Sequence, residues 1–274
     1  MKFYNTFINL FFLAGTILLL IFTVLSGSSN HFPLNRFYWL EADTSDIPNA
    51  PADRSAWTFW GVCDKDDYSN CLTGPAYPIS PEDNFNATSN VPLKFLNQQN
   101  TFYYLSRFSF AFCLIALAFT GISFIIGILS FCFLVIDKIV IFLISIGLLF
   151  LTAFCSCQTA VIVLAKQAFN DADRYAHVGA KSMGIMWASF VCLVICWLLV
   201  FSSNIAQSYR KHMNRVNQEK GYNQQQQGYP ENDQSSFTRS QPVVKDETPA
   251  NNNTGGIRFF KIKRNQKVSD EESE

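Results

Sequence analysis

The sequence predicts an all-α transmembrane four-helix bundle that carries a small, disulfide-stapled, β-rich extracellular loop. The chain has four long apolar runs, its charged residues make up only 15% of 274 positions, and two cysteines lie close together in a polar segment. A soluble domain has about 25% charged residues, so this low share indicates a polytopic membrane protein. The balance of 21 basic and 21 acidic residues leaves no basic excess, which argues against nucleic-acid binding.

The first predicted span is the uncharged run 7–25, which follows a short N-terminal segment, 1–6. At about 1.5 Å per residue the run reaches about 28 Å, close to the roughly 30 Å of a bilayer's hydrocarbon core. A cleaved signal peptide is the alternative, with Lys2 as its basic region and the small residues of 26–28 as its exit. The run is long for the apolar part of a signal peptide, which favours a retained span.

Three further spans are predicted at 108–136, 139–164 and 183–203. Only Asp137 and Lys138 separate the second span from the third, so a tight turn and an antiparallel helical hairpin are expected. The spans are expected to be helical because a backbone that faces lipid must satisfy its own hydrogen bonds.

Basic residues near the span ends predict that both termini are cytoplasmic. Lys2 precedes the first span, and a dense basic cluster follows the fourth span: Arg210, Lys211, Arg215 and Lys220. The loop 165–182 also carries basic residues, but acidic residues lie among them and the cluster after the fourth span is denser. The segment 26–107 is then the first extracellular loop, 165–182 is the second, 137–138 is a cytoplasmic turn, and 204–274 is a cytoplasmic tail.

The first loop is acidic, with nine acidic and five basic residues, and its many prolines and aromatics predict short strands and turns. Cys63 and Cys71 are its cysteines, and in an oxidising compartment such a pair can form a disulfide that contributes about 2–4 kcal/mol. Free or metal-binding thiols are the alternative. A metal would need further ligands, and the extracellular histidines are only His31 and His177, so the disulfide is favoured.

Two tryptophans, Trp57 and Trp60, precede the cysteine pair. They can anchor the loop at the headgroup region, as tryptophan often does, or form the apolar core of the loop by packing on the disulfide. Gly61 beside them would permit a close backbone approach, which favours the core. Carbohydrate stacking is a third option. Asn86 begins an Asn-Ala-Thr glycosylation sequon that this side of the membrane could use.

Polar and small residues within the spans predict packing roles. Gln158 is expected to hydrogen-bond a neighbouring helix, and no carboxylate lies well inside a span, which disfavours active transport. Small residues recur every four positions at Ala180, Gly184 and Ala188, as on a close-packed face of the bundle or of an oligomer. Cys132, near the cytoplasmic end of the second span, is a candidate for palmitoylation.

The tail is rich in Gln, Asn and Ser, which predicts disorder. Near its end, basic residues alternate with apolar ones, at Arg258, Lys261, Lys263 and Arg264. Such a run suits an anionic inner leaflet, at about 1 kcal/mol per charge, although a solvated basic run is the alternative. Ser269 precedes acidic residues, and its phosphorylation would weaken attachment to lipid. No nucleophile with a base, paired carboxylates or phosphate loop can be assembled, so neither an enzyme nor a cofactor is expected.

Seven longer motifs extend from the first loop to near the C-terminus, at 35–39, 47–50, 57–63, 76–85, 102–110, 183–189 and 256–262. Together they resemble the fungal SUR7/PalI family. The resemblance implies a four-span plasma membrane protein of eisosomes, the furrow-like static domains of the fungal cortex, linked to endocytosis, cell wall assembly, sphingolipid content and sporulation. The partners it implies are sterol- and sphingolipid-rich membrane, eisosome scaffold proteins, other copies or family members in lateral oligomers, and the cell wall.

The pattern of Trp60, Gly61, Cys63 and Cys71, with Arg107 at the second span, is also similar to claudins. Claudins place a tryptophan and a disulfide in an external loop made of strands, which implies a claudin-like fold here. The main hypothesis is therefore a structural organiser of a membrane domain. The alternatives are a PalI-type subunit of an ambient-pH sensing complex and a claudin-like pore.

Overall fold

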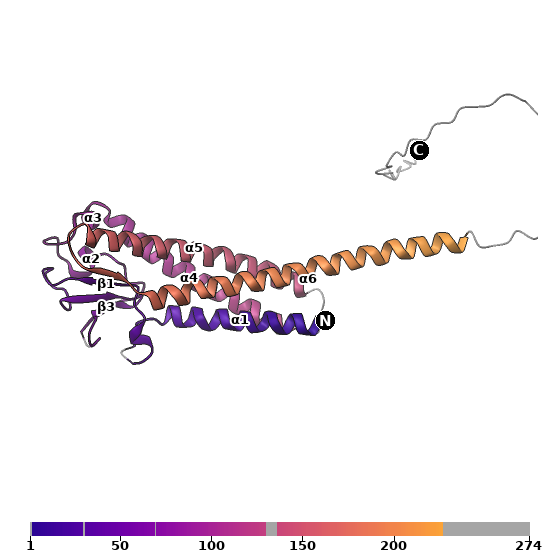
Figure 1. Ribbon diagram of the computed structural model, residues 1–274, viewed down its shortest axis with the longest axis horizontal. Helices are drawn as coiled ribbons and strands as arrows, with labels where there is room; N and C mark the ends of the chain where they lie inside the picture. The colour runs from indigo at the N-terminus through magenta and orange to yellow at the C-terminus, as the bar shows by residue number, and fades with distance from the viewer. Residues whose placement is uncertain (1, 30, 69, 130–135, 227–274) are drawn as a thin grey trace, which may run out of the picture. The chain divides into compact units, whose positions relative to one another are not determined.

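A computed structural model describes residues 2–29, 31–68, 70–129 and 136–226. Its four long helices lie beside one another, with a small sheet at one end (Figure 1). These helices are α1 (Lys2–Val24), α4 (Gln99–Leu129), α5 (Ile136–Asn170) and α6 (Ala180–Gln226). Each contains a stretch that is long and apolar enough to cross a membrane. The predicted class, a four-helix membrane bundle with a disulfide-stapled β-rich loop, is confirmed.

The central helices are longer than the predicted spans. α4 and α5 contain 31 and 35 residues. At about 1.5 Å per residue they measure roughly 46 and 52 Å, well beyond the roughly 30 Å of a hydrocarbon core. α4 therefore starts at Gln99, ahead of the predicted start at 108, and α5 continues to Asn170 rather than 164. Hydropathy marks where a helix meets lipid, whereas the helix itself ends where its backbone is capped.

The predicted two-residue turn at Asp137 and Lys138 is wrong. α5 begins at Ile136, so both residues lie in its first turn, where a carboxylate is favourable beside the positive end of the helix dipole. The predicted end of the second span at 136 is wrong for the same reason, since Ile136 is the first residue of α5. Residues 130–135, which include the candidate palmitoylation site Cys132, lie outside the described residues.

The predicted start of disorder at 204 is also wrong. α6 is 47 residues long and continues through the basic cluster to Gln226. From 204 to 220 the chain has neither glycine nor proline and is rich in helix-forming residues, so nothing ends the helix at the membrane surface. The tail positions Arg258, Lys261, Lys263, Arg264 and Ser269 lie outside the described residues.

Close contacts hold α4 against α5. A Cβ added to Gly147 would lie 3.2 Å from the Thr120 side chain, so this glycine lets the two helices approach. Farther along, the Ser109 hydroxyl donates a hydrogen bond to the side-chain oxygen of Gln158, and both residues are buried. This bond confirms the interhelical role predicted for Gln158.

The sheet is antiparallel, five-stranded and ordered β4-β3-β2-β1-β5. Its strands are β1 (Leu40–Asp43), β2 (Arg54–Trp57), β3 (Gly61–Asp64), β4 (Cys71–Thr73) and β5 (Ala176–Val178). The first loop supplies β1 to β4, as predicted, together with the short helices η1 (Leu34–Arg36), α2 (Pro81–Phe85) and α3 (Leu93–Asn97). β5 was not predicted. It comes from the second loop, so both loops build one folded unit. This unit, the cap, consists of β1–β5, α2 and α3.

Candidate functional site

The face of the sheet that packs on the helices carries a continuous apolar row. Strand register places its members side by side, in the order Val178, Leu40, Trp57, Val62 and Leu72. All five belong to or pack against the main hydrophobic core. Adjacent residues of a strand face opposite sides of the sheet. The residues that precede or follow the members of this row in each strand therefore face away from the helices.

Trp57 is the centre of this row and is fully buried. Its ring centroid lies 5.8 Å from that of Phe169 in α5 and 6.1 Å from that of Phe85 in α2. The indole N–H donates a 2.8 Å hydrogen bond to the side-chain oxygen of Asn84, which satisfies the polar atom of a buried tryptophan. Trp57 therefore belongs to the core, as predicted, and connects the sheet to α5.

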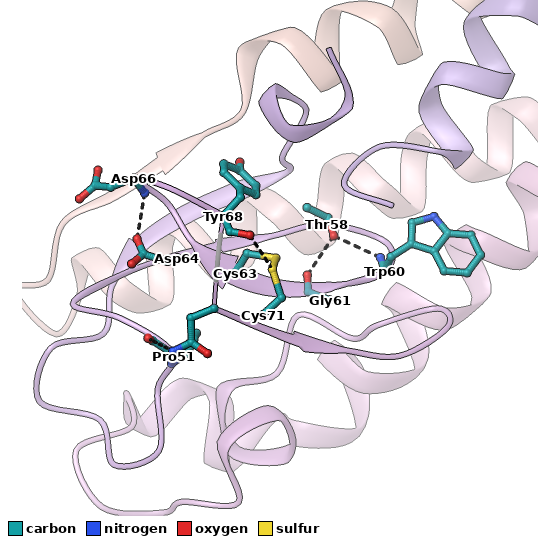
Figure 2. Close-up of a disulfide and its surroundings, with 10 residues drawn as sticks. Pro51, Thr58, Trp60, Gly61, Cys63, Asp64, Asp66, Tyr68 and Cys71 are labelled. Carbon is teal, nitrogen blue, oxygen red and sulfur yellow. Dashed lines mark hydrogen bonds between the residues drawn. A yellow bond between two sulfur atoms is a disulfide. The ribbon is translucent and has the colours of Figure 1, made fainter. Parts of the chain in front are cut away.

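Trp60 connects the sheet to two other helices. Its indole N–H donates a 2.7 Å hydrogen bond to the carbonyl of Val24, the last residue of α1. This bond satisfies one of the carbonyls that a helix end leaves unpaired. The Trp60 ring also lies 5.9 Å from the Phe110 ring of α4. The turn between β2 and β3 that carries Trp60 is fixed by the Thr58 hydroxyl, which bonds the Gly61 carbonyl and the Trp60 N–H (Figure 2).

Gly61 is required by the approach of β4. A Cβ at this position would collide with the carbonyl oxygen of Leu72, a backbone atom that cannot rotate away. The close backbone approach expected for Gly61 is therefore present, and it involves the neighbouring strand.

The opposite face carries a second row, ordered His177, Glu41, Ala56, Cys63 and Cys71. Cys63 and Cys71 are register partners in β3 and β4 and form the predicted disulfide (Figure 2). Around it lies a small separate cluster that includes Ala56 and Tyr68. The expectation that the tryptophans pack on the disulfide is wrong. Ala56 is opposite Cys63, so Trp57, one residue later, faces the helices instead.

The remaining predicted positions are not brought into this arrangement. Arg107 is exposed on α4, where its guanidinium lies 4.5 Å from the Tyr103 ring centroid. Asn86 is exposed at the C-terminal cap of α2, with a left-handed φ of 47°. Its side chain is therefore open to modification.

Sequence reasoning missed the polar part of the outer row. Glu41 is only 6% exposed, lies opposite His177 across β1 and β5, and is 3.7 Å from the Arg54 guanidinium. Burial, followed by the Glu41 carboxylate, raises the pKa of Tyr38 to about 12. A single glutamate in an acidic loop gives no sign of burial. Only the pairing with β5 reveals it.

Within the described ranges, no group of His, Cys, Asp or Glu side chains could hold a metal ion. The buried groups instead join the two loops to each other and to three helices. Because these buried contacts tie the sheet to the helices, the outer surface of the cap has a fixed shape.

A model of the SUR7/PalI family matches residues 5–199. The chain is 71% identical over 273 residues to Protein SUR7 of Candida albicans, and the match covers all of both chains. Identity to Protein SUR7 of Saccharomyces cerevisiae is 51% over 199 residues, which is 71% of this chain and 66% of that protein. A further S. cerevisiae relative, described as an uncharacterised plasma membrane protein, is 33% identical over 214 residues, or 74% of this chain and 70% of the relative.

Proposed function

The chain belongs to the SUR7/PalI family of membrane proteins, and we propose that it is a structural organiser of a static plasma membrane domain. This domain is an eisosome or a similar furrow-like compartment of the cell cortex. Four apolar helices and a relative named as a plasma membrane protein support a multi-pass plasma membrane protein. The proposal adds the cortical domain and its links to endocytosis, cell wall assembly, sphingolipid content and sporulation.

The observation that carries this proposal is the single sheet built from both loops and attached to the bundle. Trp60 binds the end of α1, Trp57 packs on α5, and β5 leads directly into α6. A lateral organiser needs a surface of fixed shape that its neighbours can recognise. Pores and carriers need polar or ionisable groups along their spans, and the described membrane segments place no carboxylate deep inside.

Sidedness and partners follow as parts of the same proposal. Both termini are cytoplasmic, the cap faces the cell wall, and the tail meets scaffold proteins and anionic lipid. Lateral assembly would use the small-residue face of α6. Ala180, Gly184 and Ala188 are all exposed, and a Cβ at Gly184 would have no neighbour within 4 Å among the described residues.

Imaging tests this proposal. A fluorescent fusion should form stable cortical patches that do not exchange by diffusion, and deletion of the gene should alter the furrows. Uniform, freely diffusing surface fluorescence would contradict the proposal. If deletion abolished growth at alkaline pH but left the furrows intact, the PalI-type sensing subunit would be the better description. Ion or solute flux through liposomes carrying the purified protein would favour the pore.

A further inference from the structure

The outer face of the cap contains a polar pocket of about 460 Å³. Three segments that are far apart in the sequence form it: 35–38 before β1, 65–68 after β3, and 177–181 at the junction of β5 and α6. The pocket therefore exists only when both loops have assembled into one sheet. It lies on the same side as the disulfide, away from the core between sheet and helices.

One wall of the pocket is a buried tyrosine without a hydrogen-bond partner. Tyr68 is 6% exposed, and its hydroxyl bonds no other described residue. Its ring packs in the small cluster beside the disulfide, and Figure 2 shows it next to Cys63 and Cys71. Buried hydroxyls are nearly always bonded, so an orphan beside a polar pocket points to a group that binds there.

The charges that line the pocket are mixed. Arg36, Lys65 and Lys181 supply three cations, while Asp66 and Asp67 supply two carboxylates. The Lys65 ammonium lies 4.7 Å from the ring centroid of Tyr38, which holds its chain against the wall. The three cations would attract a simple anion, but the two carboxylates would repel it. An acyl chain would contact few apolar side chains in this pocket.

We propose that this pocket binds an oligosaccharide. Each sugar hydroxyl can donate to a carboxylate and accept from an ammonium or guanidinium, so a polyhydroxylated ligand matches a wall of mixed charge without being charged itself. The inference deepens the proposed function, because it rests on the cap facing the polysaccharides of the cell wall. It assigns Asp66 as a hydroxyl acceptor and Tyr68 as the group that the ligand satisfies.

The test uses the full chain in detergent or nanodiscs, titrated calorimetrically with hexasaccharides of β-1,3-linked glucose, β-1,4-linked N-acetylglucosamine and mannose. At least one should bind with a Kd on the order of 1 mM or tighter. Tyr68→Phe should weaken that binding roughly fivefold, as loss of one hydrogen bond would, while thermal stability stays equal or rises because a buried orphan hydroxyl is removed. Tyr77→Phe is the matched control, since Tyr77 is a partly buried tyrosine outside the pocket, and it should bind like the wild type.

The direction in which Asp66→Asn changes the affinity distinguishes an oligosaccharide site from an anion site. The substitution should weaken binding if the carboxylate accepts from sugar hydroxyls, whereas an anion site would bind its ligand more tightly once that negative charge is removed. Three results would each overturn the proposal. The first is no binding of any hexasaccharide at about 10 mM, and the second is an equal effect of the two tyrosine variants on binding. The third is displacement of the hexasaccharide by inorganic phosphate, with phosphate binding more tightly to Asp66→Asn. The cortical patches of the fusion protein report separately on the organiser function, so either idea can fail alone.

Discussion

Gly61 shows how one residue determines whether the cap closes. Its missing side chain leaves room for the Leu72 carbonyl of the neighbouring strand. We expect Gly61→Ala to lower the free energy of unfolding by about 1–3 kcal/mol, because β3 and β4 must move apart. Thermal melting of the purified full chain measures this change. Gly121→Ala, in α4, is the control: its Cβ meets nothing within 4 Å among the described residues, and alanine is the better helix former, so its melting temperature should be unchanged or slightly higher.

Tyr38 makes the cap sensitive to alkaline pH. The ordinary tyrosine pKa is 10.0, and burial together with Glu41 raises the pKa of Tyr38 to about 12. The unfolded chain thus releases this proton near pH 10 while the folded chain retains it, so the stability that depends on neutral Tyr38 is complete below pH 10 and is lost as the pH rises to about 12.

The melting temperature should therefore fall between pH 10 and 12, and Tyr38→Phe, which cannot ionise, should flatten that fall. Burial also raises the pKa of Tyr68, so the double variant with Tyr68→Phe should be flatter still. The measurement is tryptophan fluorescence during thermal melts at fixed ionic strength. Parallel curves for the wild type and both variants would show that Tyr38 does not control the alkaline transition.

At the scale of elements, the β3–β4 hairpin depends on its disulfide. The bridge joins register partners at the edge of the sheet, where β4 pairs with β3 alone among the described strands. Cys63→Ser, Cys71→Ser and the double variant should show the same defect, a loss of about 2–5 kcal/mol and retention in the secretory pathway. Surface biotinylation and non-reducing gels measure it. Cys192→Ala, at a free cysteine of α6, should be delivered normally; full surface delivery of either serine variant would exclude a structural bridge.

The sequence predicted elements well where one local property determines them. Length and apolar content were enough for the four helices, and cysteine spacing with compartment was enough for the disulfide. Helix ends could not be predicted, because α4 begins as a helix before its predicted lipid-facing part and α6 continues as a helix after its own. The side of the sheet predicted for Trp57 was wrong, because that side depends on the register between β2 and β3. A shift of one residue in this register moves every side chain of the strand to the other face, and the local sequence does not show which register forms.

At the scale of the molecule, the sequence could not show that the two loops form one sheet. β5 has only three residues, too few for a strand pattern to appear, and its partner β1 is more than a hundred positions earlier. Arg174 supports the same junction through its 3.5 Å contact with the Asp46 carboxylate. The polar pocket and the buried Glu41 depend on this pairing, so they were beyond sequence reasoning.

Sidedness is a property of the whole chain, and Asn86 can report it. Its sequon is exposed on the cap, whereas the sequon at Asn252 lies in the tail, so glycosylation of one and not the other fixes which side each occupies. If the cap is extracellular, the wild-type protein should carry one N-linked glycan, seen as a band shift that glycosidase removes. Asn86→Gln should abolish that shift, and Asn252→Gln should leave it unchanged. A shift that depends on Asn252 would place the tail outside, and the outward cap, the oxidised cysteine pair and the wall-facing pocket would then have to be abandoned together.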